Sequence, residues 1–196
     1  MNKHTCTSLL KLFNKVDNVE ELATLLVYNK FKCIGRIALA KKLDISERKA
    51  RNLIDKLISK NLLVHGTETC INTEVNSLIP SCSTIKQDKK LITLIKELSD
   101  ELLDSIDKNI VLLRDTLIIT LGNPWVFEVI GYIKGSTIAI PQTPKTIAKK
   151  YSELLKGISG TSNTLFIIWN TYKEHHHEAA LILSIMKLCN HILGST

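Results

Sequence analysis

The chain lacks the features of a membrane protein and of several enzyme classes. It has no apolar run of the roughly 18 to 20 residues that span a bilayer. Its first residues, MNKHTCTSLLKLF, show neither a long apolar core nor a cleavage site of a secretion signal. No Gly-rich phosphate loop, Ser/His/Asp arrangement or paired-carboxylate motif stands out. We therefore expect a cytoplasmic, non-enzymatic protein with no membrane contact and no cofactor.

The cysteines show no paired pattern. The five cysteines are odd in number and no two have C-x-x-C spacing. A structural zinc site uses more closely spaced pairs, so no metal site is expected. The pattern predicts buried, reduced thiols, as in most cytoplasmic proteins, at Cys6, Cys33, Cys70, Cys82 and Cys189.

The excess of positive charge is confined to the first third of the chain. Hydrophobic residues make up 44% and charged residues 23%, as in a folded globular protein. Residues 1–66 hold thirteen Lys and Arg against six Asp and Glu, a difference of +7, while residues 67–196 hold thirteen of each. A basic module beside a neutral one indicates a polyanionic partner for the basic module.

Helical periodicity and turn residues in this basic part predict a winged helix-turn-helix. The expected order is helix, helix, tight turn, helix and a two-stranded hairpin. Ser46 is placed to cap the third helix, and Glu47 stands in its acid-favouring first turn. The predicted helices cover residues 8–30, 36–43 and 46–60, and the predicted strands cover 61–64 and 69–75.

The third helix separates into an apolar arc and a polar arc at 100° per residue. The apolar arc holds Ala50, Leu53, Ile54, Leu57 and Ile58. On the opposite arc an arginine suits guanine and an asparagine suits adenine in a major groove, while flanking cations suit phosphates. The predicted contacts to double-stranded DNA are Arg36, Lys41, Lys42, Ser46, Arg48, Lys49, Arg51, Asn52 and Lys56. A solvated charged face is the alternative.

The same stretch resembles the winged-helix domains of bacterial and archaeal transcription regulators. Their pattern, a small-residue helix "LAxxL", an "xIS" turn and then "xRTVRxxLxxLxxxGLV", is matched at Leu39, Ala40, Leu43, Ile45, Ser46, Arg48, Arg51, Ile54, Leu57, Leu62 and Val64. Lys49 replaces the usual Thr, and Asn61 the usual Gly. More loosely, the chain resembles archaeal proteins that join such a domain to a poorly characterised α/β domain with an "RD" pair, here Arg114-Asp115. The resemblance implies a DNA-binding regulator.

The predicted hairpin leaves a second function open. Residues 62–74 contain no Lys or Arg, whereas Glu68 and Glu74 are present. A wing that follows a DNA backbone is normally basic. The alternative is therefore a winged helix that meets protein or RNA without sequence-specific DNA binding.

Beyond the hairpin the pattern predicts a second, small α/β domain and an overall α+β fold. We expect a winged-helix domain at 1–76, a linker at 77–87 and an α/β domain for dimerisation or ligand sensing at 88–196. Its expected elements are an amphipathic helix at 88–107, a strand or helix from 110, a hairpin at 125–141, a helix at 145–157, a buried strand at 164–170 and a last helix at 174–193. The first of these helices could serve as a connector or a dimerising helix, and the last as a core helix or half of a subunit interface.

Two groups in this domain attract a functional interpretation. Arg114, Asp115, Asn170 and Thr171 could line a pocket for a small-molecule effector, because ligands bind at the carboxyl ends of strands in α/β sheets. The run His175-His176-His177 suggests a metal, but neighbours on a helix point about 100° apart. A solvated helix start is the expectation there, and a homodimer is expected because DNA readers of this kind bind two half-sites.

Overall fold

The computed structural model describes residues 3–158 and 162–194. Its helices are α1 (Cys6–Phe13), α2 (Val19–Phe31), α3 (Arg36–Leu43), α4 (Glu47–Ser59), α5 (Thr73–Leu78), α6 (Asp100–Lys108), α7 (Ile110–Leu121), α8 (Lys145–Leu155) and α9 (His176–Gly194). Its strands are β1 (Leu63–His65), β2 (Thr69–Ile71), β3 (Cys82–Gln87), β4 (Lys90–Ile95), β5 (Phe127–Lys134), β6 (Thr137–Ala139) and β7 (Thr164–Trp169). No helix in these two ranges is long and apolar enough to span a bilayer.

The larger sheet has the strand order β3-β4-β7-β5-β6, and every neighbouring pair is antiparallel. The predicted α+β class is therefore right, whereas the α/β domain predicted at 88–196 is wrong in its sheet. Adjacent strands run in opposite directions, so their carboxyl ends do not gather at one edge as they do in a parallel sheet.

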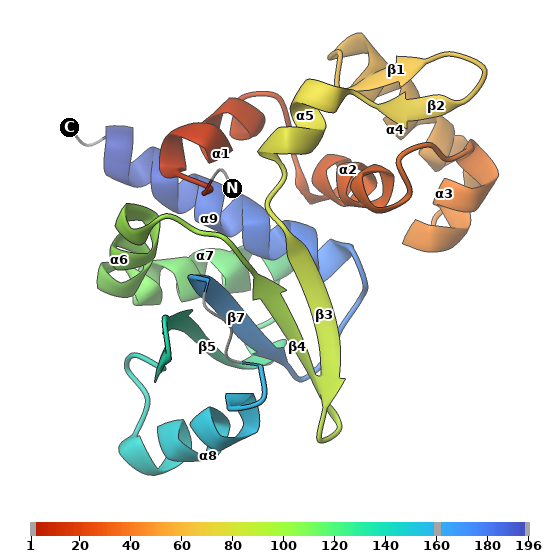
Figure 1. The fold of residues 1–196 in the computed structure, drawn as a ribbon. Helices are drawn as coiled ribbons and strands as arrows, with labels where there is room; N and C mark the ends of the chain where they lie inside the picture. The colour runs from red at the N-terminus through yellow and green to blue at the C-terminus, as the bar shows by residue number, and fades with distance from the viewer. Residues whose placement is uncertain (1–2, 159–161, 195–196) are drawn as a thin grey trace.

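Helices cover both faces of this sheet. In Figure 1, α8 lies on one side and α6, α7 and α9 lie on the other. The predicted strand β7 is buried along its whole length, and its side chains alternate between the two layers. Leu165 and Ile167 join the core under α9, while Phe166 and Ile168 join the core under α8. Gly131 on β5 leaves room for the Phe166 ring, because a Cβ there would lie 2.5 Å from it.

The predicted amphipathic helix at 88–107 is wrong. This segment is the strand β4 followed by the helix α6. The stripe of leucines and isoleucines suited a helix, but Ile92 to Ile95 are all buried, as in a central strand covered on both faces. The predicted linker at 77–87 also contains the strand β3, whose register with β4 is set by a two-residue turn at Asp88 and Lys89, both with positive φ.

Other elements of the second half match the prediction. The hairpin β5–β6 turns over residues 135–136, Pro144 precedes α8, and residues 110–121 form the helix α7 rather than a strand. The last helix is a core helix, buried on nearly every side from His177 to Met186. It is therefore not available as a subunit interface along that length.

The N-terminal helices pack onto the C-terminal part. The predicted helix at 8–30 is two helices, because Asn18 starts α2 by accepting a hydrogen bond from the Glu21 N–H at 3.0 Å. Both α1 and α2 lie along α9 in Figure 1, and their apolar side chains share one continuous core with it. The predicted returning strand at 69–75 ends at Ile71, where Asn72 caps the short helix α5.

The expectation of five reduced thiols is wrong. Cys6 is disulfide-bonded to Cys189, and Cys33 to Cys70, which leaves Cys82 as the free thiol. The two cysteines of each pair are far apart in sequence, by 183 residues in the first pair and 37 in the second, so no short motif could predict either disulfide. Packing of α1 on α9, and an isolated β-bridge between Cys33 and Cys70, bring the sulfurs together.

Candidate functional site

A pair of short helices, α3 and α4, carries the residues predicted to contact DNA. Asp44, in the left-handed region at φ 55°, ends α3. Ser46 then starts α4 as predicted, because its side chain accepts a hydrogen bond from the Lys49 N–H at 3.2 Å. The tight turn between the two caps fixes how α4 crosses α3.

The burial of the α4 side chains confirms that the helix has an apolar arc and a polar arc, as predicted. Ala50, Leu53, Ile54 and Leu57 are buried, and Ile58 is partly buried. On the opposite arc Arg48, Arg51 and Asn52 are exposed, as are Lys41 and Lys42 on α3. None of these four cations forms an ion pair within residues 3–158 and 162–194, although the Lys42 ammonium lies 4.7 Å from the centre of the Phe31 ring. They remain accessible to a polyanion.

Three other predicted DNA contacts are engaged within the protein. Lys49 pairs with Glu20, Lys56 with Asp17 and Glu21, and Arg36 lies 3.8 Å from Glu47. Lys49, Lys56 and Lys60 lie one above another on one flank of α4, which faces the acidic start of α2. The helical periodicity predicted Lys49 and Lys56, like Arg51, as phosphate contacts. It could not show that α2 covers the flank of α4 that carries the two lysines.

The flank of α4 is anchored by a fully buried carboxylate, that of Glu21. Lys56 Nζ lies 2.5 Å from its Oε1, Lys60 Nζ lies 2.7 Å from its Oε2, and the Asp17 N–H donates to Oε2 at 3.0 Å. Burial raises the pKa of Glu21, but the hydrogen bonds from Lys56 and Lys60 outweigh it and leave the pKa below its ordinary value of 4.5. The hydrogen bonds from Lys56 and Lys60 also lower the pKa of the exposed Asp17 to about 2.

Because these carboxyl pKa values are depressed by folding, the acid cluster stabilises the fold above the unfolded pKa and loses that effect as pH falls through the folded one. We expect the melting temperature to drop between about pH 4 and pH 2, the interval between the ordinary pKa of 3.8 and the folded value for Asp17. Asp17→Asn should flatten this dependence when melting is followed by circular dichroism. Glu68→Gln, an exposed control outside the ion pairs of the described chain, should leave it unchanged; equal curves for Asp17→Asn and the unsubstituted protein would contradict the role of the cluster.

The hairpin that follows α4 is short and carries no cation. β1 and β2 pair antiparallel over three residues each, from Leu63 opposite Ile71 to His65 opposite Thr69. The disulfide between Cys33 and Cys70 fastens β2 to the segment that leads into α3. The hairpin is thus held firmly against the helices, but its exposed tip offers Glu68 rather than a phosphate ligand.

The four residues predicted for an effector pocket do not come together. Arg114 and Asp115 are exposed on α7, and the Arg114 Nε donates to Asp115 at 3.2 Å. Asn170 donates to the Trp125 carbonyl at 3.0 Å, and the Thr171 N–H donates to the Val126 carbonyl. Arg114 lines a small pocket of about 90 Å³ beside β5, and neither Asn170 nor Thr171 lines it. The prediction assumed a parallel sheet, and the antiparallel sheet has no such strand-end crevice.

Comparison with known proteins supports the fold alone. No protein-family profile matches the chain, and no curated protein matches it. One solved structure is similar. It is described as a hypothetical protein from Pyrococcus horikoshii OT3, and it aligns with a TM-score of 0.50 at 16% identity over 92% of this chain and 95% of that chain. The mixed α+β arrangement is therefore shared over nearly the whole length of both chains.

The histidine run is not a solvated helix start. His175 and His177 are buried and His176 is partly buried. The His177 ring lies 4.9 Å from the Trp169 ring, and burial, followed by the charge of His176, lowers the pKa of His177 to about 4. His177 is therefore a neutral packing residue at neutral pH. Within the described ranges no three His, Cys, Asp or Glu side chains are placed to hold a metal ion.

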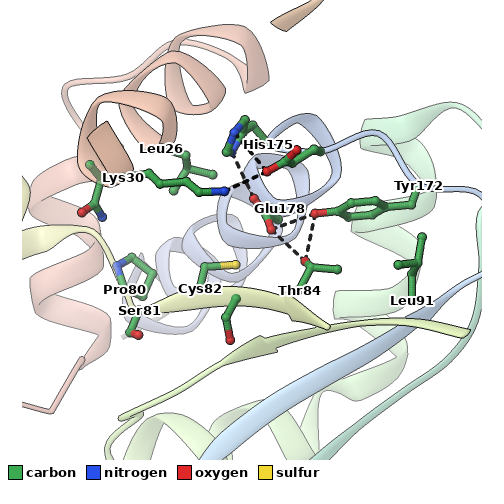
Figure 2. A pocket seen from close by; sticks show the side chains of 13 residues that line it. Leu26, Lys30, Pro80, Ser81, Cys82, Thr84, Leu91, Tyr172, His175 and Glu178 are labelled. Carbon is green, nitrogen blue, oxygen red and sulfur yellow. Dashed lines mark hydrogen bonds and ion pairs between the residues drawn. The ribbon is translucent and has the colours of Figure 1, made fainter. Parts of the chain in front are cut away.

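His175 instead lines a pocket of about 560 Å³ between α2, β3 and the start of α9. Figure 2 shows Lys30 entering from α2, Cys82 and Thr84 from β3, and Glu178 from α9. Sequence reasoning missed this site, because it joins segments that are far apart in the chain. Glu178 was a weak signal: an acid beside a long apolar stretch of α9 that proves to be buried.

The Glu178 carboxylate is the centre of the polar network in this pocket. Its Oε1 accepts hydrogen bonds from the Thr84 hydroxyl at 2.7 Å and from the Tyr172 hydroxyl at 2.8 Å. Burial raises the pKa of Glu178, but contacts with His175, Thr84 and Tyr172 outweigh it, so the net shift is downward. The group is an anion at neutral pH. Burial, and then the Glu178 charge, raise the pKa of the Cys82 thiol well above its ordinary value, so it is not an activated nucleophile.

Proposed function

We propose that the chain is a DNA-binding transcription regulator, in which residues 1–76 form a winged helix-turn-helix and α4 is the recognition helix. The observation that carries this proposal is the exposed group Arg48, Arg51 and Asn52, with Lys41 and Lys42 beside it. Its four cations are held by no acid within the described chain. These residue types are the ones that read bases and neutralise phosphates in a major groove.

The element order and the charge distribution support the same proposal. α3, the turn at Asp44 and α4 precede the hairpin β1–β2, which is the order expected of a winged helix. The net charge of +7 lies within residues 1–66. Lys49 and Lys56 are removed from the set of proposed DNA contacts, because their ion pairs join α4 to α2. Arg48 and Asn52 become the proposed base contacts, and Lys41, Lys42 and Arg51 the proposed phosphate contacts.

The hairpin favours a second candidate function. It contains no cation, and Glu68 stands at its exposed tip. A wing of this charge would be repelled by a phosphate backbone but not by a protein surface. This charge favours an interaction module that uses the same helix on a protein; RNA is the other partner proposed, with the wing turned away from its phosphates.

The proposed DNA reader acts as a homodimer. One short recognition helix contacts too few bases for tight specific binding, so two copies would occupy two half-sites. The buried part of α9 is excluded as the contact between them. Ile119 on α7 and Trp125 after it remain 79% and 80% exposed, and a second copy of the chain is proposed to cover them. A small-molecule effector is proposed as well.

Binding to mixed-sequence duplex DNA over a range of salt concentrations tests this function. We expect the logarithm of the association constant to fall linearly with the logarithm of salt, with a slope of about −0.9 for each phosphate contacted. Competition with structured RNA separates the two candidates, and sedimentation of the free and DNA-bound protein gives the number of copies. Salt-independent binding, or a preference for RNA, would overturn the DNA proposal.

A further inference from the structure

The most unusual polar group outside the basic surface is the side chain of His175. It is 3% exposed, and neither ring nitrogen makes a hydrogen bond within residues 3–158 and 162–194. Its backbone has a positive φ of 60°, a conformation that few non-glycine residues adopt. Buried polar groups normally have hydrogen-bond partners, because an unpartnered one has lost its hydrogen bonds to water without a replacement. A buried imidazole that makes no hydrogen bond and lines a pocket therefore points to a ligand-binding role.

The surroundings of His175 contain more acceptors than donors. Its Nδ1 lies 3.3 Å from Glu178 Oε2, and its Nε2 lies 3.5 Å from Glu174 Oε1. A neutral imidazole has one N–H and one lone pair, so it can offer a proton to only one of two carboxylates. The other carboxylate then faces a lone pair. Lys30 already donates to Glu174 Oε1, but no donor of the described chain reaches the imidazole lone pair, so an anion or a pure acceptor would make the mismatch worse.

The other titratable groups around the pocket leave it without a surplus of positive charge. They are Lys30, whose ammonium lies 3.0 Å from Glu174 Oε1, and the neutral groups Cys82 and Tyr172. Lys30 and His175 together carry at most two positive charges, against the two carboxylates of Glu174 and Glu178. The walls also include Leu26 and Leu91, which suit a short aliphatic stem. The volume of about 560 Å³ lies within the range of small-molecule sites, which is roughly 300–1,000 Å³.

We propose that this pocket binds a small aliphatic amine, whose ammonium group donates to His175 and to the carboxylates of Glu174 and Glu178. An ammonium has three donors and no acceptor, so it supplies the hydrogen-bond donor that the imidazole lacks. The hydroxyls of Thr84 and Tyr172 already occupy Glu178 Oε1, so its Oε2 is the oxygen left for the amine. The site does not depend on DNA binding, because none of the proposed DNA contacts lines it.

A matched series of four-carbon compounds tests this assignment on the full-length protein. Putrescine carries two ammonium groups, the corresponding diol carries two hydroxyls, and succinate carries two carboxylates on a stem of similar length. We expect calorimetric binding of putrescine, accompanied by a change in the imidazole nitrogen resonances of His175. The diol and succinate should bind at least about tenfold more weakly, the difference expected for one charge-assisted hydrogen bond.

Variants separate the site from general acidity of the surface. Glu174→Gln and Glu178→Gln are each expected to weaken putrescine binding about tenfold to a hundredfold, and Glu101→Gln, an exposed acid on α6, should leave it unchanged. Glu174 is half exposed, so its variant keeps the test valid if Glu178→Gln fails to fold. The proposal is overturned by equal or tighter binding of the diol or succinate, by no binding of putrescine, or by an imidazolium spectrum of His175 in the ligand-free protein at neutral pH. In the last case a proton alone would supply the missing donor.

Discussion

Replacing Arg48 and Arg51 together with alanine is expected to weaken the proposed specific DNA binding strongly while leaving the fold intact. Both side chains are exposed and make no ion pair within the described chain, so their loss leaves no buried charge unpaired. A bidentate contact of an arginine to a guanine contributes about 1–3 kcal/mol, so loss of the Arg48 contact should weaken binding roughly fivefold to a hundredfold or more. If Arg51 contacts a phosphate, the salt slope should also fall in magnitude by about 1.

The matched control removes the same charge elsewhere. Lys145 and Lys149 are exposed on α8, which lies on the far side of the larger sheet from α9. Fluorescence anisotropy with a labelled duplex should show little change for Lys145→Ala with Lys149→Ala. A similar loss in both double variants would mean that only the net charge matters, and it would refute the role of α4 as a recognition helix. Melting curves of both proteins check that the fold is retained.

Reduction of the disulfide between Cys6 and Cys189 is expected to have the largest effect on stability. This bond joins α1 to α9 across 183 residues, so it closes a loop that contains most of the chain. The chain-entropy relation gives about 5 kcal/mol for a loop of this length at 25 °C, as an upper bound. Urea unfolding of Cys6→Ser with Cys189→Ser should therefore show a midpoint well below that of the unsubstituted protein.

Two measurements make the disulfide prediction decisive. Titration of thiols in the denatured, non-reduced protein should find one free thiol, that of Cys82. A reducing agent should lower the unfolding midpoint of the unsubstituted protein and of Cys82→Ser alike, because Cys82 belongs to neither bond. Five titratable thiols in the denatured protein, or an unfolding midpoint that does not respond to reduction, would contradict both bonds.

Helices and strands could be predicted from the sequence where their hydrophobic periodicity fits only one type of secondary structure. In α4 the cap at Ser46 and the apolar arc from Ala50 to Leu57 follow from local chemistry, and the same holds for the buried strand β7. The segment from residue 88 could not be predicted in this way. Its apolar stripe suits one face of a helix as well as a strand covered on both sides, and only the neighbours β3 and β7 favour the strand.

For the functional residues, sequence determined which side chains are available, and tertiary structure decided which of them are free. Cations at 100° spacing on α4 indicated a basic surface, but the acids of α2 engage Lys49 and Lys56 and leave Arg48 and Arg51 exposed. For the pocket around His175 the sequence held only the weak signal of Glu178, since Lys30, Thr84 and Glu178 meet only through packing of α2 and β3 against α9. Local patterns determine helices and caps because those depend on near neighbours in the chain. Ion pairs, disulfides and pockets depend on residues that folding brings together from distant segments.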